Sequence, residues 1–241
     1  MNQGSTSLRL EDNAGVGVVI VSAGEGQRMG GIDKIRTLVS GRPLLAYGVD
    51  AFEMCQYVTE IVIVLASVHL EWGKELVERE GWKKVSSVCS GGKTRIDSAK
   101  YGFDALSYCH WVMVHDGARP CVTVDLIDRG VDCVPITGAA VPGVPVKDTI
   151  KQIDVDNLVI NTPPRESLWS IQTPQVFGYD ILKRVYMESS TNATDNVTDD
   201  STLAERLGYN VKVFEGSYEN VKITTPGDLK LVETMLLSRS R

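Results

Sequence analysis

One stretch of this chain decides its fold: Val18-Val19-Ile20-Val21-Ser22-Ala23-Gly24-Glu25-Gly26-Gln27-Arg28-Met29-Gly30, with Lys34 shortly after. Four consecutive apolar β-formers predict a buried strand. The glycine-rich turn behind them lets backbone N–H groups face an anion without interference from Cβ atoms. Arg28 and Lys34 add fixed positive charge. A strand, a donor-rich turn and two cations together predict a phosphate-binding site.

The spacing of the glycines excludes two common phosphate-binding motifs. Gly24, Gly26 and Gly30 give G-x-G-x-x-x-G, which is one residue longer than the dinucleotide fingerprint, and no G-K-[ST] ends a Walker A loop. The alternative interpretation is a strand-to-helix turn that merely needs glycine. The two cations favour anion binding, because a solvated cation needs no glycine loop behind it.

Length and composition predict one domain of the α/β class. The 241 residues are 43% hydrophobic and 23% charged, which is enough to bury one substantial core. We expect a flexible tail over residues 1–15 and a single domain over residues 16–241. The formal net charge of −6 argues against a general binder of nucleic acid or of a membrane, since such a protein needs a broad basic surface.

Cysteine usage and the N-terminal residues indicate a reducing compartment. The five cysteines are odd in number and contain no C-x-x-C pair, so neither a zinc knuckle nor a disulfide framework is predicted. The polar N-terminus lacks the apolar region of a signal peptide, and no apolar run reaches the length of a bilayer. We therefore expect a cytoplasmic protein.

Short apolar runs alternate with helix-like stretches through the first half of the chain. This β-α alternation predicts a Rossmann-like, mostly parallel sheet flanked by helices, with ligands beyond the carboxyl ends of the strands. The predicted strands are 17–22, 60–66, 85–90 and 111–115, and the predicted helices are 43–55, 70–80, 94–106 and 124–133.

Polar, glycine-rich loops follow three of the predicted strands. After the Gly24 loop come Gly91-Gly92-Lys93-Thr94-Arg95 and Asp116-Gly117-Ala118-Arg119-Pro120. A carboxylate such as Asp116 at a strand end can hold Mg²⁺ against phosphate oxygens or bind a hydroxyl, whereas the alternative is an aspartate that caps the turn. The three histidines have no paired spacing, which argues against a histidine-based metal site.

Residues 135–173 interrupt the β-α rhythm. Prolines break β-like runs over 144–153 and 158–162, which predicts a projecting β-arm at about residues 142–172, with a floppy insertion as the alternative. A protruding ribbon leaves unpaired edges that a second copy of the chain commonly covers, so we expect the arm to be used for dimerisation. Beyond the arm, the predicted helices are 179–187, 201–207 and 226–237, and the predicted strands are 211–214 and 220–223.

The ordered motifs resemble those of one family, the 2-C-methyl-D-erythritol 4-phosphate cytidylyltransferases of the non-mevalonate isoprenoid route. The similarity runs from about Val18 to Leu236 in seven blocks. They are Ala23-Gly24-x-Gly26-x-Arg28-Met29, Gly91-Gly92-x-x-Arg95-x-x-Ser98, His115-Asp116-x-Ala118-Arg119-Pro120, Pro145-Val146-x-Asp148-Thr149-Ile150-Lys151, Arg165-x-x-Leu168-Trp169-x-x-Gln172-Thr173-Pro174-Gln175, Thr198-Asp199-Asp200 and Asn220-x-Lys222-x-Thr224.

The resemblance implies a reaction in which methylerythritol phosphate attacks the α-phosphorus of CTP and expels pyrophosphate, with Mg²⁺ as cofactor. Its implied catalytic residues are Arg28, Lys34 and Lys222, which would neutralise the crowded phosphates. The implied nucleotide-binding residues are Ser22, Ala23, Gly24, Gly26, Gly91, Gly92, Arg95 and Ser98. The implied contacts of the polyol phosphate are Asp116, Arg119, Asp148, Thr149, Arg165, Thr173 and Thr198, with Asp116 also the candidate metal ligand.

The resemblance also implies a homodimer in which Asp148, Thr149 and Arg165 reach from the arm into the site of the partner. Three other interpretations stay open at this point. A ribitol 5-phosphate cytidylyltransferase would share nearly all of the chemistry and differ in the polyol. A catalytically silent nucleotide-binding protein could use the same fold. A nicotinamide-dependent oxidoreductase is disfavoured by the glycine spacing and the cations.

Overall fold

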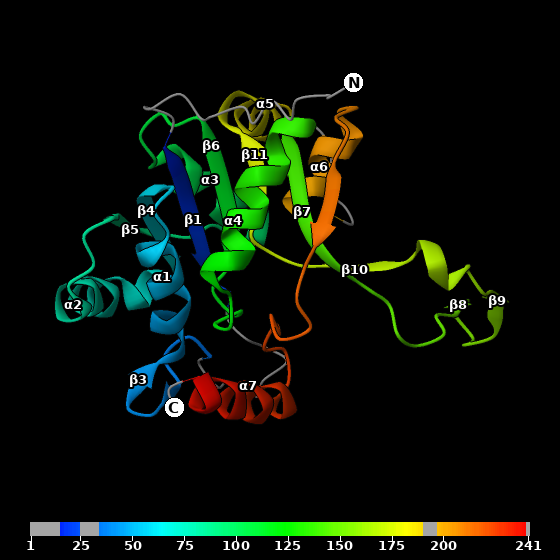
Figure 1. Cartoon of the computed structure of the whole chain (residues 1–241), viewed down its shortest axis with the longest axis horizontal. Coiled ribbons are helices and arrows are strands. Elements are labelled where there is room, and N and C mark those ends of the chain that lie inside the picture. Colours follow the sequence, from blue (N-terminus) through cyan, green and yellow to red (C-terminus); the bar gives the residue numbers. More distant parts are fainter. Residues whose placement is uncertain (1–14, 25–33, 190–196, 240–241) are drawn as a thin grey trace, which may run out of the picture.

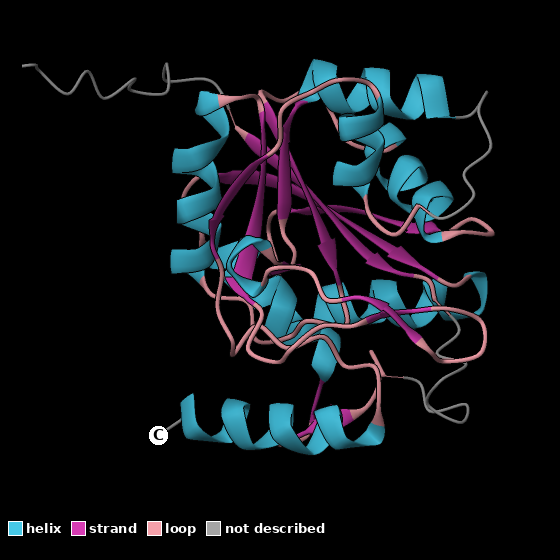
Figure 2. Ribbon diagram, turned by 90° about the vertical axis from the view of Figure 1, so that its right-hand side faces the viewer, coloured by secondary structure: helices cyan, strands magenta, loops and turns pink. Residues whose placement is uncertain are grey.

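A mixed β-sheet crosses the molecule, with helices on both of its faces (Figure 1, Figure 2). The structure is a computed structural model that describes residues 15–24, 34–189 and 197–239. The expected tail lies outside these residues except for Gly15. The strand order is β10-β7-β11-β6-β1-β4-β5, with β12 beside β7. The strands of this sheet are β1 (Val16–Ser22), β4 (Val58–Leu65), β5 (Val85–Ser90), β6 (Trp111–Asp116), β7 (Ala139–Pro145), β10 (Trp169–Ile171), β11 (Gln175–Gly178) and β12 (Lys212–Glu215).

The parallel half of the sheet is formed by β5, β4, β1 and β6. Strand β1 lies between two parallel neighbours, with Val19 opposite Val62 on one side and Val114 on the other. A strand covered by helices on both faces needs an almost unbroken apolar run, which the valine-rich sequence of β1 supplies. The predicted parallel strands are therefore confirmed.

The other half of the sheet contains antiparallel pairs that the sequence did not predict. Strand β11 lies between β6 and β7 and is antiparallel to both. Its four residues are too few for a periodic signal. Two small pairs lie outside the sheet, β2 (Leu38–Val39) with β3 (Arg42–Pro43) and β8 (Gln152–Ile153) with β9 (Val159–Asn161).

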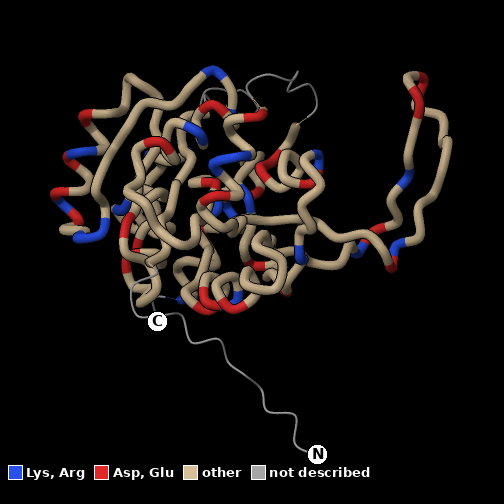
Figure 3. The backbone as a smooth tube through the Cα atoms, turned by 90° about the horizontal axis from the view of Figure 1, so that it is seen from above, with Lys and Arg blue, Asp and Glu red and all other residues tan. Residues whose placement is uncertain are grey.

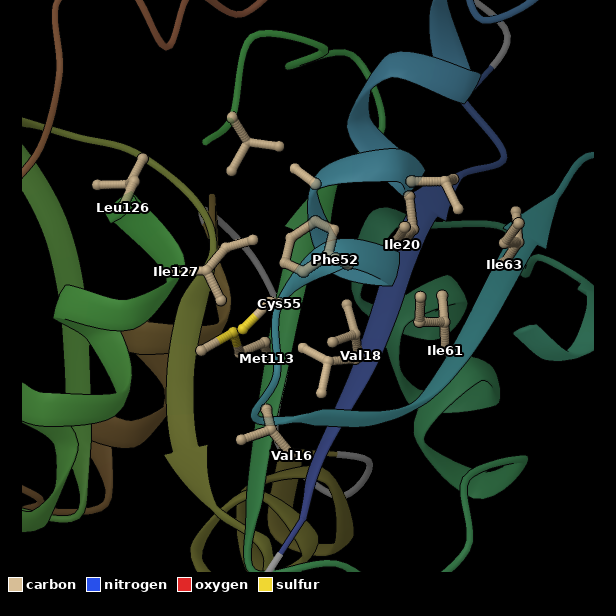
Figure 4. Close-up of a cluster of buried hydrophobic side chains, with 14 of the residues drawn as sticks. Val16, Val18, Ile20, Phe52, Cys55, Ile61, Ile63, Met113, Leu126 and Ile127 are labelled. Carbon is tan, nitrogen blue, oxygen red and sulfur yellow. The ribbon is translucent and has the colours of Figure 1, made fainter. Parts of the chain in front are cut away.

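Helices from different parts of the chain cover the two faces of the sheet. One face packs on α1 (Leu44–Met54), α2 (Leu70–Glu80) and α4 (Val124–Cys133). Figure 4 shows this apolar layer, in which Phe52 and Ile127 meet Val18 and Met113. The other face packs on α3 (Arg95–Asp104), α5 (Tyr179–Ser189) and α6 (Asp200–Arg206).

The last helix lies apart from both layers. Helix α7 (Pro226–Arg239) runs below the end of β1 in Figure 1 and packs Val232 and Leu236 on Val39 and Leu44. Three short 3-10 turns complete the described elements, η2 (Ser67–His69), η3 (Val134–Ile136) and η4 (Arg165–Ser167). Within the described residues, no helix combines the length and the apolar character that crossing a bilayer requires.

The arm is a projection from the sheet, and its root belongs to the sheet itself. Strand β10 pairs antiparallel with β7, so the predicted arm residues at both ends of 142–172 are sheet residues. Beyond them, the β8–β9 hairpin extends away from the body (Figure 1, Figure 3). Residues 146–151 of the predicted β-like run lie outside any strand. The projection is therefore confirmed, whereas the predicted β-like run over 144–153 is interrupted at residues 146–151.

The predicted strand at 220–223 is also wrong. This segment runs without a ladder after a turn in which Asn220 N–H donates to the carbonyl of Ser217 over 3.0 Å. A single bond from Ile223 N–H to the carbonyl of Ala118, at 2.9 Å, joins its end to the loop after β6. Side-chain hydrogen bonds replace the ladder, and the apolar alternation of the segment does not reveal them.

Close packing of α3 on the sheet gives a first prediction. A Cβ atom at Gly102 would overlap Val19 Cγ1 and lie 2.6 Å from Val64 Cγ2. Gly102→Ala should therefore lower the free energy of unfolding by about 1–3 kcal/mol, as expected for an overpacked core. Asp104→Ala on the exposed end of α3 is the control and should change it by less than about 0.5 kcal/mol. Urea denaturation of both variants measures this, and equal stability of the two would contradict the packing argument.

Candidate active site

Three loops meet at the carboxyl edge of the parallel strands. Strands β1, β4, β5 and β6 run in the same direction, so the residues that follow them lie at one edge. Gly117 donates its N–H to the carbonyl of Val21 over 2.9 Å, and Gly91 donates to the carbonyl of Leu65 over 2.8 Å. A Cβ atom on Gly91 would overlap Ala23. The predicted convergence of the loops is therefore confirmed.

The loop after β1 is described as far as Gly24. Ser22 is buried, and its Oγ has no hydrogen-bond partner among the described residues. A Cβ atom on Gly117 would overlap this oxygen, so glycine is required where the two loops approach each other. Gly26 and Arg28 of the predicted site lie outside the described residues.

The loop after β5 is held by the first turn of α3. Thr94 and Asp97 form a capping box, in which each side chain accepts the backbone N–H of the other. The buried Ser98 Oγ accepts the N–H of Gly92 over 3.0 Å and donates to the carbonyl of Thr94 over 2.9 Å. The hydroxyl of Ser98 therefore fixes the backbone of Gly92.

Asp116 is the centre of a charge cluster at this edge. Its Oδ1 accepts Arg95 Nε over 3.0 Å, and its Oδ2 lies 2.8 Å from Lys222 Nζ. Arg119 Nε is a third cation, 3.9 Å from Oδ2. Arg95 also donates through Nη1 to Asp200 over 2.7 Å. Three cations thus surround the carboxylate of Asp116, an arrangement that can bind an anionic ligand.

The cluster keeps the Asp116 carboxylate ionised. Burial alone would raise the pKa of Asp116, but the charges of Arg95 and Lys222, with the hydrogen bond from Lys222, outweigh burial. The pKa of Asp116 therefore lies well below its usual range. An ionised carboxylate at this position can accept hydroxyl groups or bind a cation while it holds the basic side chains in place.

Thr173 supports Asp116 from the backbone side. Its Oγ1 accepts the N–H of Asp116 over 3.0 Å and lies 3.1 Å from His115 Nδ1. His115 Nε2 lies 3.2 Å from the carbonyl of Arg119, which can only accept, so Nε2 carries the proton and Nδ1 accepts from Thr173. Burial lowers the pKa of His115 to about 4, which keeps the ring neutral. The hydroxyl proton of Thr173 is therefore directed at His115.

Lys222 lies on residues 216–223, the Lys222 segment, which side chains hold in place. Gln172 donates through Nε2 to the carbonyl of Ser217 over 2.8 Å and accepts the N–H of Ser217 over 3.2 Å. The buried side chain of Asn220 donates through Nδ2 to the carbonyl of Thr173 over 2.8 Å. The backbone carbonyl of Asn220 accepts from Arg119 Nη1 over 2.7 Å. These bonds join the segment to the cis Thr173–Pro174 turn and to the loop after β6.

Lys34 reaches the same segment from the other end of the chain. Its Nζ donates to the carbonyl of Ile223 over 3.0 Å, next to Lys222 in sequence. The structure therefore places the Lys34 ammonium group on the backbone of the residue that follows Lys222, while Lys222 lines the cavity described below. Arg28, the third cation that the sequence predicts, lies outside the described residues.

A cavity of about 340 Å³ opens beside the charge cluster. It contains several of the predicted polyol-phosphate contacts, together with polar residues at the start of α6. Its lining includes Arg95, Asp116, Arg119, Gln172, Thr173, Thr198, Asp199, Ser201, Thr202, Glu205 and Lys222.

The predicted arm contacts lie far from this cavity in the same chain. Asp148, Thr149 and Arg165 are exposed on the arm, which projects away from the body (Figure 1). Arg165 Nη1 donates to the carbonyl of Lys147 over 3.1 Å. These three residues therefore do not join the other predicted site residues within one chain.

Several residues of the site were missed by the sequence analysis. Gln172, Asn220 and Asp200 stand inside the quoted motifs, so their motif membership was the available signal. Tyr186, whose hydroxyl donates to Asp200 over 2.7 Å, gave no signal. An aromatic residue at helical spacing is typical of a core position.

The donor set of the site can be compared with the needs of Mg²⁺. Among the described residues, no three histidine, cysteine, aspartate or glutamate side chains lie close enough to hold a metal ion. Mg²⁺ in phosphate chemistry commonly takes one or two carboxylates, and phosphate oxygens and water complete its shell. Asp116 offers one ionised carboxylate, whose two oxygens also contact Arg95 and Lys222, so phosphate oxygens and water would have to complete the shell of a Mg²⁺ that arrives with a nucleotide.

Fold and site together define the class of protein. A Rossmann-like sheet with a glycine loop after β1 and a cluster of cations at the carboxyl edge is typical of an α/β protein that binds phosphorylated ligands. The family model for IspD, 2-C-methyl-D-erythritol 4-phosphate cytidylyltransferase, matches residues 16–238. The chain belongs to this family and is an enzyme of the nucleotidyltransferase class.

Curated relatives are similar over nearly their whole length. The chain is 45% identical over 224 residues to the 2-C-methyl-D-erythritol 4-phosphate cytidylyltransferase of Dehalococcoides mccartyi, covering 93% of this chain and 97% of the relative. It is 41% identical over 234 residues to the enzyme of the same name from Alkaliphilus oremlandii, covering 95% and 98%.

Solved structures agree with the fold. The crystal structure of 4-diphosphocytidyl-2C-methyl-D-erythritol synthase from Anaerococcus prevotii matches with a TM-score of 0.82 and 30% identity, over 94% of this chain and 100% of that chain. The Francisella tularensis 2-C-methyl-D-erythritol 4-phosphate cytidylyltransferase matches with a TM-score of 0.77 and 29% identity, over 92% and 99%.

Proposed function

We propose that the protein forms 4-diphosphocytidyl-2-C-methyl-D-erythritol and pyrophosphate from CTP and 2-C-methyl-D-erythritol 4-phosphate. A phosphate oxygen of methylerythritol phosphate attacks the α-phosphorus of CTP. The bond from that phosphorus to the oxygen that bridges the α- and β-phosphates of CTP breaks, and its electron pair leaves with that oxygen as part of pyrophosphate. The attacking oxygen is already an anion, so no protein nucleophile or base is required, and catalysis consists of positioning and charge neutralisation.

One observation supports this proposal above the others. Lys222, Arg119 and Arg95 surround a single ionised carboxylate beside a polar cavity, and Lys34 bonds to the same segment as Lys222. Two polyanionic substrates repel each other, and fixed positive side chains close to the phosphates offset this repulsion. In this proposal Lys34, Lys222 and the sequence-predicted Arg28 neutralise the phosphates at the reacting centre.

The remaining roles follow from the positions of the groups. The loops at Ser22–Gly24 and Gly91–Gly92 would hold the nucleotide, with Ser98 acting through Gly92. Asp116, Arg119, Thr173 and Thr198 would face the polyol phosphate. Asp116 would be the protein ligand of a Mg²⁺ that supplies charge neutralisation to the triphosphate.

We further propose a cytoplasmic homodimer with exchanged arms. The arm carries exposed apolar side chains, including Val155 at 97% exposure, and a monomer would leave this surface in water. Asp148, Thr149 and Arg165 lie on the same arm, outside the cavity of their own chain. A second chain would cover the apolar surface and bring these polar side chains to a site.

An assay of substrate choice tests the function. With CTP and Mg²⁺, the purified protein should release pyrophosphate when methylerythritol phosphate is supplied, and mass spectrometry should identify the cytidylyl product. Ribitol 5-phosphate and other nucleoside triphosphates run in parallel as competitors. The relatives reported above carry the methylerythritol name, so we expect this substrate to be preferred. A preference for ribitol 5-phosphate would overturn the assignment, and no product with any polyol phosphate would favour a silent nucleotide-binding protein.

A further inference from the structure

A buried row of polar groups lies behind Asp116, on the side away from Lys222. Tyr186 Oη donates to Asp200 Oδ1 over 2.7 Å. Arg95 donates through Nη1 to Asp200 Oδ2 over 2.7 Å and through Nε to Asp116 Oδ1 over 3.0 Å. The row thus joins α5, α6 and α3 to the end of β6, and we name these four residues the Tyr186–Asp116 relay.

The inner members of the relay cannot touch a ligand. Asp200 is 0% exposed and Tyr186 is 1% exposed, and both oxygens of Asp200 are used within the relay. Burial and the neighbouring Asp200 raise the pKa of Tyr186 well above its usual value, so the hydroxyl stays protonated and donates. The side-chain hydrogen bonds that link Tyr186 and Asp200 to the cavity run through Arg95.

Burying the charged groups of the relay costs hydration free energy, so stability alone does not explain why they are there. A buried ion pair such as Arg95 with Asp200 loses hydration, and apolar side chains of similar volume are often at least as stable. The guanidinium group is planar and its donors have fixed directions. Once Asp200 holds Nη1, the direction of Nε is set, and Nε meets one chosen oxygen of Asp116. The second oxygen is left for Lys222.

We propose that Asp200 and Tyr186 are positioning residues, which act through Arg95 to set the orientation of the Asp116 carboxylate toward Lys222. The inference rests on the proposed function, since it gives Asp116 its role toward the polyol phosphate. Asp200→Asn keeps the size of the side chain and removes its charge, and Tyr186→Phe removes only the hydroxyl donor. Both variants leave the backbone loops at Ser22–Gly24 and Gly91–Gly92 unchanged, whereas Arg95, which the resemblance assigned to the nucleotide, bonds to Asp116 in the structure.

The expected result is a selective loss in steady-state kinetics. Asp200→Asn should lower kcat/KM for methylerythritol phosphate at least tenfold, and Tyr186→Phe should lower it about threefold to tenfold, since it removes one of two bonds to Asp200. The KM for CTP should change by less than twofold. Val185→Ala, a buried apolar truncation next to Tyr186, destabilises the same helix and should leave both constants within twofold of the wild type.

A double-mutant cycle separates positioning from a structural role. If Asp200 acts only through Asp116, then Asp200→Asn should change kcat/KM by less than twofold in an Asp116→Asn background. The proposal is overturned if Asp200→Asn lowers kcat/KM by the same factor in the Asp116→Asn background as in the wild type. It is also overturned if neither relay variant changes kcat/KM. Tyr186→Phe in the same background serves if Asp200→Asn fails to fold.

A crystal structure of the Asp200→Asn variant tests the proposed positioning independently of the activity assay. We expect Arg95 Nε to leave Asp116 Oδ1, to a separation beyond about 3.5 Å, which is the limit of a hydrogen bond. An unchanged contact would overturn the inference. A wild-type protein that makes no cytidylyl product would overturn the proposed function instead, so the two failures are distinguishable.

Discussion

Replacing Lys222 with methionine should lower kcat about a hundred- to a thousand-fold, as expected when one preorganised charge contact to a developing negative charge is lost. Lys222 Nζ lies 2.8 Å from Asp116 Oδ2, and the side chain is 40% exposed, so a ligand in the cavity can reach it. Methionine retains most of the apolar stem and removes only the charge. The loss should therefore appear in kcat far more than in the KM for CTP, and steady-state kinetics at saturating CTP measures it.

The control for this variant is Lys212→Met on β12. Lys212 is an exposed lysine of β12, the strand that precedes the Lys222 segment in the chain, and it does not line the cavity. The same change of charge there should leave kcat within twofold of the wild type. A Lys222→Met protein that folds normally and retains more than a tenth of wild-type kcat would contradict the role assigned to Lys222.

Mixing two inactive variants should restore activity if the arm works in the site of a partner. Arg165→Glu reverses a charge on the arm, and Lys222→Met disables the body. After subunit exchange in an equal mixture, half of the dimers contain one chain of each kind, and each has one intact site. The mixture should therefore recover about one quarter of the wild-type activity.

A matched mixture excludes trivial rescue. Lys222→Met chains mixed with chains that carry both substitutions can form no intact site across the dimer, so this mixture should stay inactive. Mass spectrometry of intact complexes checks that mixed dimers form in both cases. Mixed dimers without recovered activity in the first mixture would show that Arg165 does not act in trans.

Much of the fold could be predicted because its signals are local. The predicted bounds of α2, α4 and β5 agree with the structure at both ends. Helix α4 shows why, since the N-cap Thr123 and the apolar periodicity that follows mark its start within a few residues. The convergence of the Gly91 and Asp116 loops follows from strand direction alone, which the β-α alternation determines.

The unpredicted features depend on partners that are distant in sequence. Arg95 bonds to Asp200, 105 residues away, and this pairing places Arg95 behind Asp116. The 220–223 segment has apolar alternation, yet Arg119 and Lys34 bond to the backbone carbonyls of Asn220 and Ile223 and no strand forms. Likewise, the register of β11 between β6 and β7 is set by tertiary pairing, which no window of its own sequence contains.

The attachment of the Lys222 segment has a practical consequence. A stretch held by a few side-chain bonds can detach at a much lower free-energy cost than unfolding of the whole domain. Warming or dilute urea should then silence turnover while far-ultraviolet circular dichroism still reports a native helix content. After storage, such a preparation would look intact by its circular dichroism spectrum and by its elution volume in size-exclusion chromatography. Only active-site titration would show which fraction of the sites is still catalytically active.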